Sequence, residues 1–208
     1  MKATAFVIAL ATAAPAAAQT DRFALRPYGM ITEQAFSAQT TFKAIFGQSA
    51  EPFWGAGAEL ILPGNIYIDV SASRFKKTGQ RAFINNGQTF PLGIPLTATL
   101  TPFEVTGGYR FHLRRQNSLT PFVGVGIGSY AYKETSTFSG PGEDIDTRHV
   151  GELVVGGVEL RVHRWVALSF DAQYTHIPGI LGLGGLSKDA GETDLGGFAG
   201  RFKFVVGR

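Results

Sequence analysis

The chain has 208 residues, with 19 Lys and Arg against 16 Asp and Glu, four histidines and no cysteine. Without cysteine it can form neither disulfide bonds nor a thiolate metal site, and its charges are too balanced and too scattered to indicate a nucleic-acid partner. The 27 glycines and 17 phenylalanines, together with a lack of amphipathic helical spacing, favour β-structure.

The N-terminal stretch has the layout of a cleavable secretory signal peptide. Lys2 supplies a positive start, residues 3–14 are small and apolar, and residues 16–18 are all alanine, as a signal peptidase requires. The apolar run is too short to span a bilayer, which disfavours a retained anchor. We therefore predict residues 1–18 as a signal peptide and residues 19–208 as one exported domain.

Alternation of apolar and polar residues, read against turn signals, predicts eight strands. Most of them are about ten residues or longer, which is the length that a tilted strand needs to cross a hydrocarbon core. The predicted strands are residues 23–36, 53–62, 66–75, 97–113, 120–133, 149–162, 166–176 and 196–206.

The predicted connections alternate between short and long. The short links are 63–65, 114–118 and 163–165, and the long ones are 37–52, 76–96, 134–148 and 177–195. Outer-membrane barrels show this alternation because their periplasmic turns are short and their external loops long. The predicted fold class is therefore all-β: an eight-stranded antiparallel transmembrane β-barrel after a signal peptide, with both termini periplasmic.

The strand faces predict which side chains line the interior. In residues 166–176, Leu168 and Phe170 alternate with Ser169 and Asp171, and a membrane barrel turns the apolar set outward. The inward set then collects five acids and five bases, a balance that buried charges need because they are costly unless paired. These residues are Arg26, Glu59, Asp69, Glu104, Arg110, Glu159, Arg161, Asp171, Arg201 and Lys203. Because an eight-stranded barrel holds little more than its own side chains, we expect a plug of ion pairs rather than an aqueous channel.

The outward face is almost free of charge, with Glu152 near one rim as the exception, and aromatic residues are expected at both edges of the bilayer. The periplasmic edge would hold Phe23, Phe111, Phe122, Trp165 and Phe204, and the outer edge Trp54, Tyr130, Tyr132, Tyr174 and Phe198. Tyr130 and Tyr132 lie on the opposite parity from Val123, Val125 and Ile127, which predicts a bulge between the two groups.

Residues 120–128, Thr-Pro-Phe-Val-Gly-Val-Gly-Ile-Gly, are similar to a strand of small outer-membrane β-barrel proteins of the OmpX and OmpA-barrel type, and residues 156–160 and 167–174 resemble that group's next hairpin. The resemblance implies the outer membrane of a Gram-negative-type bacterium, contact with outer-membrane lipid, and insertion by the barrel-assembly machinery. The chain departs from the pattern at its end, where residues 205–208 follow Phe204 in place of a terminal aromatic residue.

Other motifs favour no cofactor and no metal. The Gly-x-Gly-x-Gly run at residues 124–128 continues a strand rather than joining a strand to a helix, as a dinucleotide loop must. Residues 182–188 lack the spacing of a phosphate-binding loop. The histidines at positions 112, 149, 163 and 176 are predicted on different strands, without the spacing of metal ligands.

One enzymatic alternative is a lipid A deacylase. Tyr174 and His176, near the end of the seventh predicted strand, resemble the aromatic residue and the histidine that this family carries there. That family continues His-x-Ser with a later glutamate, whereas Pro178 stands here in the serine position, although Glu192 could supply the acid. Ser187 could replace the missing serine nucleophile only if folding brought it close, because it is distant in sequence from His176. The leading expectation is a non-enzymatic barrel that presents four polar external loops for envelope integrity or surface interaction, with an unidentified external ligand. A lipid-modifying enzyme and a narrow, porin-like pore are the alternatives.

Overall fold

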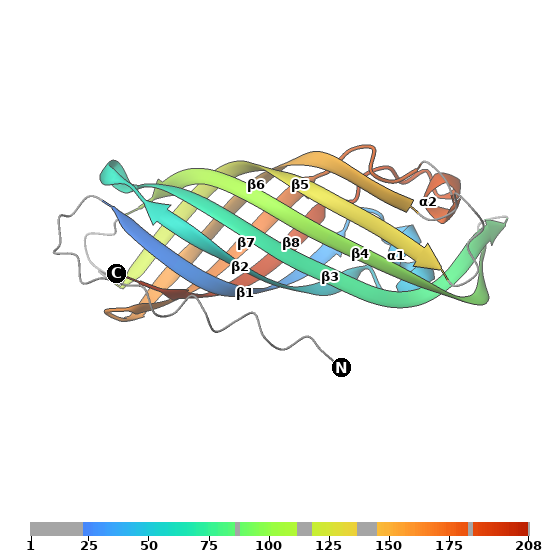
Figure 1. The fold of residues 1–208 in the computed structure, drawn as a ribbon, viewed down its shortest axis with the longest axis horizontal. Coiled ribbons are helices and arrows are strands. Elements are labelled where there is room, and N and C mark those ends of the chain that lie inside the picture. Colours follow the sequence, from blue (N-terminus) through green and yellow to red (C-terminus); the bar gives the residue numbers. More distant parts are fainter. Residues whose placement is uncertain (1–22, 86–87, 112–117, 137–144, 183–184, 208) are drawn as a thin grey trace.

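The structure is a computed structural model that describes residues 23–85, 88–111, 118–136, 145–182 and 185–207. The predicted signal peptide and its cleavage site lie outside these residues. Eight antiparallel strands close into one barrel, in which each strand pairs with its neighbour in sequence and β1 pairs with β8 (Figure 1). The predicted all-β fold with eight strands is confirmed.

The strands are β1 (Ala24–Phe36), β2 (Ala50–Ile61), β3 (Ile66–Asn85), β4 (Gln88–Arg110), β5 (Leu119–Ser136), β6 (Ile145–His163), β7 (Val166–His176) and β8 (Gly197–Val206). Helix α1 (Gln39–Phe46) follows β1, helix α2 (Gly185–Asp189) follows β7, and a 3-10 turn (Pro63–Asn65) joins β2 to β3. Across the described ranges, none of the helices has the length and apolar character that a membrane span requires.

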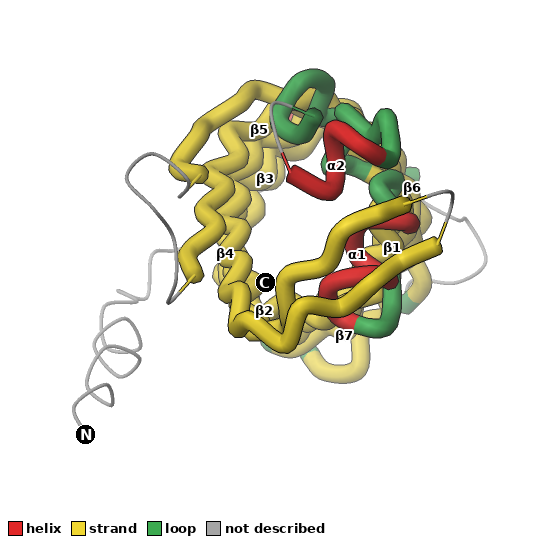
Figure 2. The backbone as a smooth tube through the Cα atoms, turned by 90° about the vertical axis from the view of Figure 1, so that its right-hand side faces the viewer, coloured by secondary structure: helices red, strands yellow, loops and turns green. Residues whose placement is uncertain are grey.

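The two ends of the barrel differ. One end, here named the terminal end, holds the start of β1, the end of β8 and the short links after β2 and β6 (Figure 1). The other, the helical end, carries α1 and α2. Figure 2 looks onto the helical end and shows both helices within the outline of the ring of strands.

The prediction of a long loop at residues 76–96 is wrong, because β3 and β4 continue as a paired hairpin as far as Asn85 and Gln88. The pairing shifts register only between Gln80 and Ala82. Opposite this shift lies Gly93, whose positive φ of 69° suits a bulge. Because β5 pairs with β4 only as far as Leu96, the hairpin rises beyond its neighbours at the helical end (Figure 1).

An apolar belt covers the outside of the barrel. Its exposed side chains include Leu25, Ile31, Ile66, Ile68, Val70, Phe103, Val105, Val123, Val125, Ile127, Val154, Val158, Leu160, Phe170 and Phe204. Going from the terminal end, the first charged side chain that faces outward is Arg74 on β3 and Lys133 on β5, and the first outward histidine on β7 is His176. On β6, no outward charge lies between Arg161, exposed at the end of the strand, and Glu152. On these four strands the stretches without outward charge run over eight to fourteen residues, which is close to the length that a tilted strand needs to cross a hydrocarbon core.

The aromatic residues follow the prediction at the two edges of the belt, with three exceptions. Exposed rings mark the terminal end at Phe23, Phe111, Trp165 and Phe204, and the far edge at Trp54, Tyr174 and Phe198. Phe122, Tyr130 and Tyr132 are instead buried inside the barrel. The bulge predicted in β5 is also wrong, because β5 pairs with β4 and β6 without a register shift. Unbroken alternation turns both tyrosines inward.

The glycine run of β5 makes room for these inward rings. A Cβ atom at Gly124, or at Gly108 on β4, would collide with the ring or hydroxyl of Tyr67 from β3. A Cβ atom at Gly128 would collide with the ring of Tyr130. The run therefore lets aromatic side chains lie close against the inner wall, which is the close approach that glycine in a strand permits.

Candidate functional site

Two arginines and two glutamates form a ring of ion pairs inside the barrel near the terminal end. Arg26 lies 2.5 Å from Glu159 and 3.5 Å from Glu59, while Arg110 lies 2.7 Å from Glu59 and 2.9 Å from Glu159. All four side chains are buried. Since each carboxylate meets both guanidinium groups, the ring offsets the cost of removing four charges from water.

Five further charges lie between this ring and the middle of the barrel. Lys203 lies 3.5 Å from Asp69 and 3.7 Å from Asp171. Arg201 lies 2.5 Å from Asp171 and 3.6 Å from Glu104. These contacts join β3, β4, β7 and β8 across the interior. The buried charges therefore cross-link strands that are not all neighbours in the sheet.

Nine of the ten predicted interior charges are buried, but the placement of Arg161 among them is wrong. Arg161 is exposed near the terminal end of β6. Arg161 still pairs with the buried Ala167, and the register of β6 and β7 shifts only after it, so Arg161 keeps the inward parity but is exposed because it lies at the very end of the barrel. Of the ten predicted residues, four bases and five acids are therefore buried, rather than five of each.

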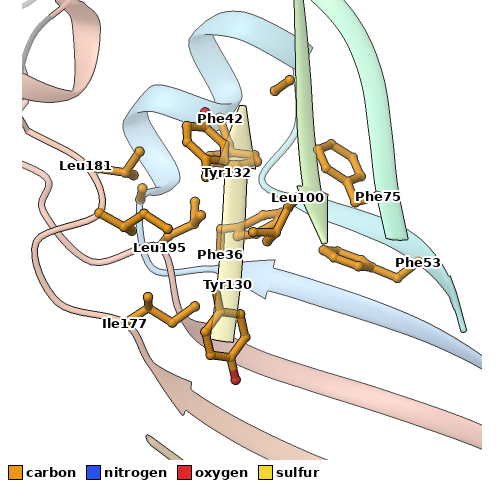
Figure 3. Packing of buried hydrophobic residues seen from close by; sticks show 13 residues of the cluster. Phe36, Phe42, Phe53, Phe75, Leu100, Tyr130, Tyr132, Ile177, Leu181 and Leu195 are labelled. Atoms are coloured by element: carbon orange, nitrogen blue, oxygen red, sulfur yellow. The ribbon is translucent and has the colours of Figure 1, made fainter. Parts of the chain in front are cut away.

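The helical half of the barrel is filled mainly by an apolar plug (Figure 3). The strands contribute Phe36, Phe53, Phe75, Leu100, Tyr130 and Tyr132, and the segments after β1 and β7 contribute Phe42, Ile177, Ile180, Leu181 and Leu195. None of these side chains is more than 4% exposed, and the rings of Phe36 and Phe42 stack at 3.9 Å. Two of the loops expected to be polar therefore supply apolar side chains to the mouth of the barrel.

Tyr130 joins the apolar plug to the charges below it. Its ring packs in the plug, while its hydroxyl donates a hydrogen bond of 2.8 Å to Glu104. The amide of Gln173 donates a second hydrogen bond, of 3.0 Å, to the same carboxylate oxygen. These two hydrogen bonds connect the apolar plug to the charged layer.

The Glu192 carboxylate anchors α1 over the mouth. Its oxygens accept hydrogen bonds from the backbone N–H of Thr40 at 2.9 Å, and from the N–H and hydroxyl of Thr41 at 2.8 and 2.6 Å. Ala38 at the N-cap provides no side-chain cap, so this distant carboxylate satisfies the orphan amides instead. Burial by itself raises the pKa of Glu192, but the hydrogen bonds from Thr41 and Thr40 outweigh it and hold the pKa below its ordinary value.

Asp194 fixes the same loop to the rim. Its carboxylate accepts hydrogen bonds of 2.8 Å from the backbone N–H groups of Ile177 and Gly196, and lies 2.8 Å from Nδ1 of His176. Burial raises the pKa of Asp194, but these three contacts outweigh it and lower that pKa overall. The acid beside His176 is therefore Asp194, whereas Glu192, which the sequence offered as the acid, is bound to α1.

The remaining candidate groups are dispersed. The Ser187 hydroxyl is buried and accepts a hydrogen bond from the Gly182 backbone N–H at 3.1 Å. His149 and His163 lie at opposite ends of one strand, β6, rather than on different strands, and His112 lies outside the described residues. Within the described part of the chain, no three His, Asp or Glu side chains gather as metal ligands.

Comparison with known proteins agrees with this architecture. Residues 3–196 match the family described as the outer membrane protein beta-barrel domain. Neisserial surface protein A is 14% identical with a TM-score of 0.51, over 89% of this chain and 95% of that one. Ail, the attachment invasion locus protein of Yersinia pestis, solved with the heparin analogue sucrose octasulfate, is 9% identical with a TM-score of 0.51, over 90% and 98%.

A search of curated protein sequences finds no match. At such low identities the two structures show a shared fold alone, whereas the family match extends over most of the sequence. The apolar belt is the part of such a barrel that faces lipid. The chain belongs to the outer membrane protein beta-barrel domain family and is an eight-stranded outer-membrane barrel.

Proposed function

We propose that the protein is a non-enzymatic, closed barrel that displays a rigid interaction surface outside the cell. Both termini would be periplasmic, because the short links lie at the terminal end and outer-membrane barrels place their short turns there. The helical end, with α1, α2 and the raised β3–β4 hairpin, would face the exterior.

The filled interior carries this proposal. The ring of ion pairs, the charges around Arg201 and the apolar plug follow one another along the barrel axis, and their side chains are buried. A conducting pore needs a continuous wet path, and an apolar segment packed at its mouth opposes one. This arrangement supports a closed barrel over the narrow pore.

The hairpin is built to hold a fixed shape. A Cβ atom at Gly79 of β3 would collide with the carbonyl oxygen of Ile45, so α1 packs directly on the hairpin backbone. Lys77 of β3 lies 2.6 Å from the buried Glu51 carboxylate, and its ammonium lies 5.6 Å from the centre of the Phe46 ring. A preorganised surface binds a partner at a lower entropic cost than a mobile loop does.

The deacylase alternative is less well supported. His176 is exposed at the rim with Asp194 beside it, which provides a base and an acid. Pro178 offers no hydroxyl at the position of the family's serine, and the Glu192 carboxylate is committed to Thr40 and Thr41. Nucleophilic catalysis requires a hydroxyl within hydrogen-bond reach of the base.

The test is reconstitution of the full-length protein into planar bilayers and into vesicles that contain lipid A. We expect no stepwise conductance and no release of fatty acid, with a general porin and a lipid A deacylase as positive controls. Discrete conductance steps would establish the pore instead. Released fatty acid that disappears in His176→Ala would establish the enzyme.

A further inference from the structure

Four cationic side chains face outward beyond the apolar belt on three strands of one side of the barrel. Arg74 and Lys76 stand on β3, Lys133 on β5 and Arg148 on β6, and all four are exposed. We name this group the cationic face. Its residues follow the last apolar positions of their strands, such as Val70 on β3, towards the helical end.

Strand register brings these residues into two adjacent rows. Lys76 pairs with Thr99, which pairs with Lys133, and Lys133 pairs with Asp146. Strands in a sheet are about 4.8 Å apart, so the backbones of Lys76 and Lys133 are separated by about 10 Å. One multiply charged headgroup can therefore reach more than one of these cations.

The second row lies one step closer to the apolar belt. Thr101 pairs with Ala131, and Ala131 pairs with Arg148. Arg74 extends this row onto β3, since it lies between the register pairs Ala72–Phe103 and Phe75–Leu100. The threonines on β4 add neutral hydroxyl donors between the cations.

The charge around the rim is asymmetric. Among the described residues of the cationic face, the one acid is Asp146, which lies 3.2 Å from Lys133, so four bases and one acid leave these residues with a formal charge of +3. Of the other outward-facing acids on the described strands, Glu33 lies on β1, away from this face, and Glu152 lies on β6 between Arg148 and the apolar belt. A rim that served only for solubility would carry both signs mixed together.

A groove of about 500 Å³ lies in the apolar belt near this face. Val105, Val125, Ile127 and Val154 line it around Gly126. Glu152 and His176 also line it, in the same row as Ile127. The small outward side chains Ser129 and Ala131 of β5 lie between the groove and Lys133. The barrel surface thus offers an apolar channel that leads to a cluster of positive charges.

We propose that the cationic face and this groove bind a phosphorylated glycolipid of the outer leaflet. Its phosphates would contact Arg74, Lys76 and Arg148, its sugar hydroxyls the threonines of β4, and an acyl chain the groove. Arginine suits this role because its guanidinium group binds phosphate through two parallel hydrogen bonds. The inference rests on the proposed orientation, in which the helical end faces the exterior.

The experiment measures binding of bisphosphorylated lipid A to the full-length protein in detergent, with a chelator present to remove bridging divalent cations. The test variant is the triple substitution Arg74→Gln, Lys76→Gln and Arg148→Gln. We expect this variant to bind at least about tenfold more weakly than the parent protein. The parent should also bind dephosphorylated lipid A at least about tenfold more weakly.

A matched control removes three exposed cations elsewhere, with Lys43→Gln, Lys188→Gln and Arg164→Gln. Its affinity should stay within about twofold of the parent, because any loss that reflects net charge alone would be the same in both triple variants. Equal losses in the two variants, or affinity independent of phosphate, would refute the proposal. Tighter binding of phosphatidylglycerol than of lipid A would refute the glycolipid assignment. None of these results bears on conductance, so the closed-barrel proposal is tested separately.

Discussion

Thr41 in α1 donates two hydrogen bonds to the carboxylate of Glu192, which lies 151 positions away in the chain. The contact joins the segment after β1 to the segment after β7, directly over the apolar plug that both segments help to form. Asp194 fixes the second segment to the rim through the amides of Ile177 and Gly196. Two ionised carboxylates therefore hold the plug in place.

Glu192→Ala should loosen α1 without unfolding the barrel. A hydrogen bond to a charged group contributes roughly 1.5–3 kcal/mol, so the amides of α1 should exchange with solvent about 10 to 100 times faster. Hydrogen exchange with mass spectrometry measures this directly. Glu33→Ala, which removes an exposed carboxylate from the same end of β1, serves as the control and should leave α1 unchanged. Unaltered exchange in the Glu192 variant would show that the plug holds α1 without the carboxylate.

Acid should loosen the plug in the same way. The pKa values of Glu192 and Asp194 are both lowered in the folded protein. Their stabilisation is therefore complete above the unfolded values, about 4.3 and 3.9, and is lost as the pH falls through the folded ones. Exchange of α1 amides, corrected for intrinsic rates, should be constant from pH 7 to 5 and rise below about pH 4. Glu192→Gln should already show faster exchange at pH 7, with a weaker response to acid.

The ring of ion pairs predicts strong coupling between Arg110 and Glu59. Arg110→Met or Glu59→Met alone should cost roughly 3–5 kcal/mol, because each leaves a buried charge short of a partner. The double variant should cost much less than the sum, since Arg26 and Glu159 still pair at 2.5 Å. Urea unfolding in lipid vesicles gives the four free energies. Arg161→Met, on an exposed arginine, should change stability by less than about 0.5 kcal/mol.

The sequence predicts the strands well where they cross the lipid, because apolar and polar residues must alternate there. In β7, Phe170 faces outward and Ser169 and Asp171 face inward, as the period of two requires. The prediction of strands from sequence fails where a strand extends beyond the lipid, because neither of its faces needs to be apolar there. The part of β3 from Lys76 onward therefore looks like a loop, although Lys76 to Gln80 pair with β4. Pro91 and Pro95 strengthen that impression, yet both lie in the part of β4 beyond its pairing with β5.

The side chains of the interior could also be predicted only in part. Parity predicts that Glu59, Glu104 and Arg201 face inward, but it cannot show which charges meet, because their partners come from distant strands. The apolar plug could not be predicted, since Phe42 and Ile180 come from segments without a strand period. A signal was nevertheless present: Phe36, Phe53, Phe75 and Leu100 occupy the inward parity in the half of each strand nearer the helical end. Apolar residues on both faces of a strand indicate something apolar inside.

Phe170 and Phe202 face lipid as a contacting pair, with ring centroids 4.9 Å apart. Phe170→Arg should cost roughly 2–4 kcal/mol, because it places a charge against hydrocarbon near mid-depth. Ser169→Ala, at the buried neighbouring position on the inward face, should cost clearly less. Both values follow from urea titration of the refolded barrel in vesicles. Similar costs for the two substitutions would mean that residue 170 does not lie in the hydrocarbon.

The last prediction concerns the direction of the barrel in the membrane. The chain has no cysteine, so single cysteines at exposed positions can report accessibility without background. Gln80→Cys on the raised hairpin and Lys188→Cys on α2 should react with an impermeant thiol reagent on whole cells. Arg164→Cys, in the short link after β6 at the terminal end, should react only after the outer membrane is permeabilised.

This pattern is expected because short turns of outer-membrane barrels lie on the periplasmic side, and the helical end then faces outward. Phe170→Cys provides the internal control, since a thiol in hydrocarbon should stay unreactive on both sides of the membrane and be reached by a lipid-borne quencher. Reaction at 164 with protection at 80 and 188 would invert the topology and remove the basis of the glycolipid site. Reaction at 80 and 188 alone would place the hairpin and the cationic face on the cell surface.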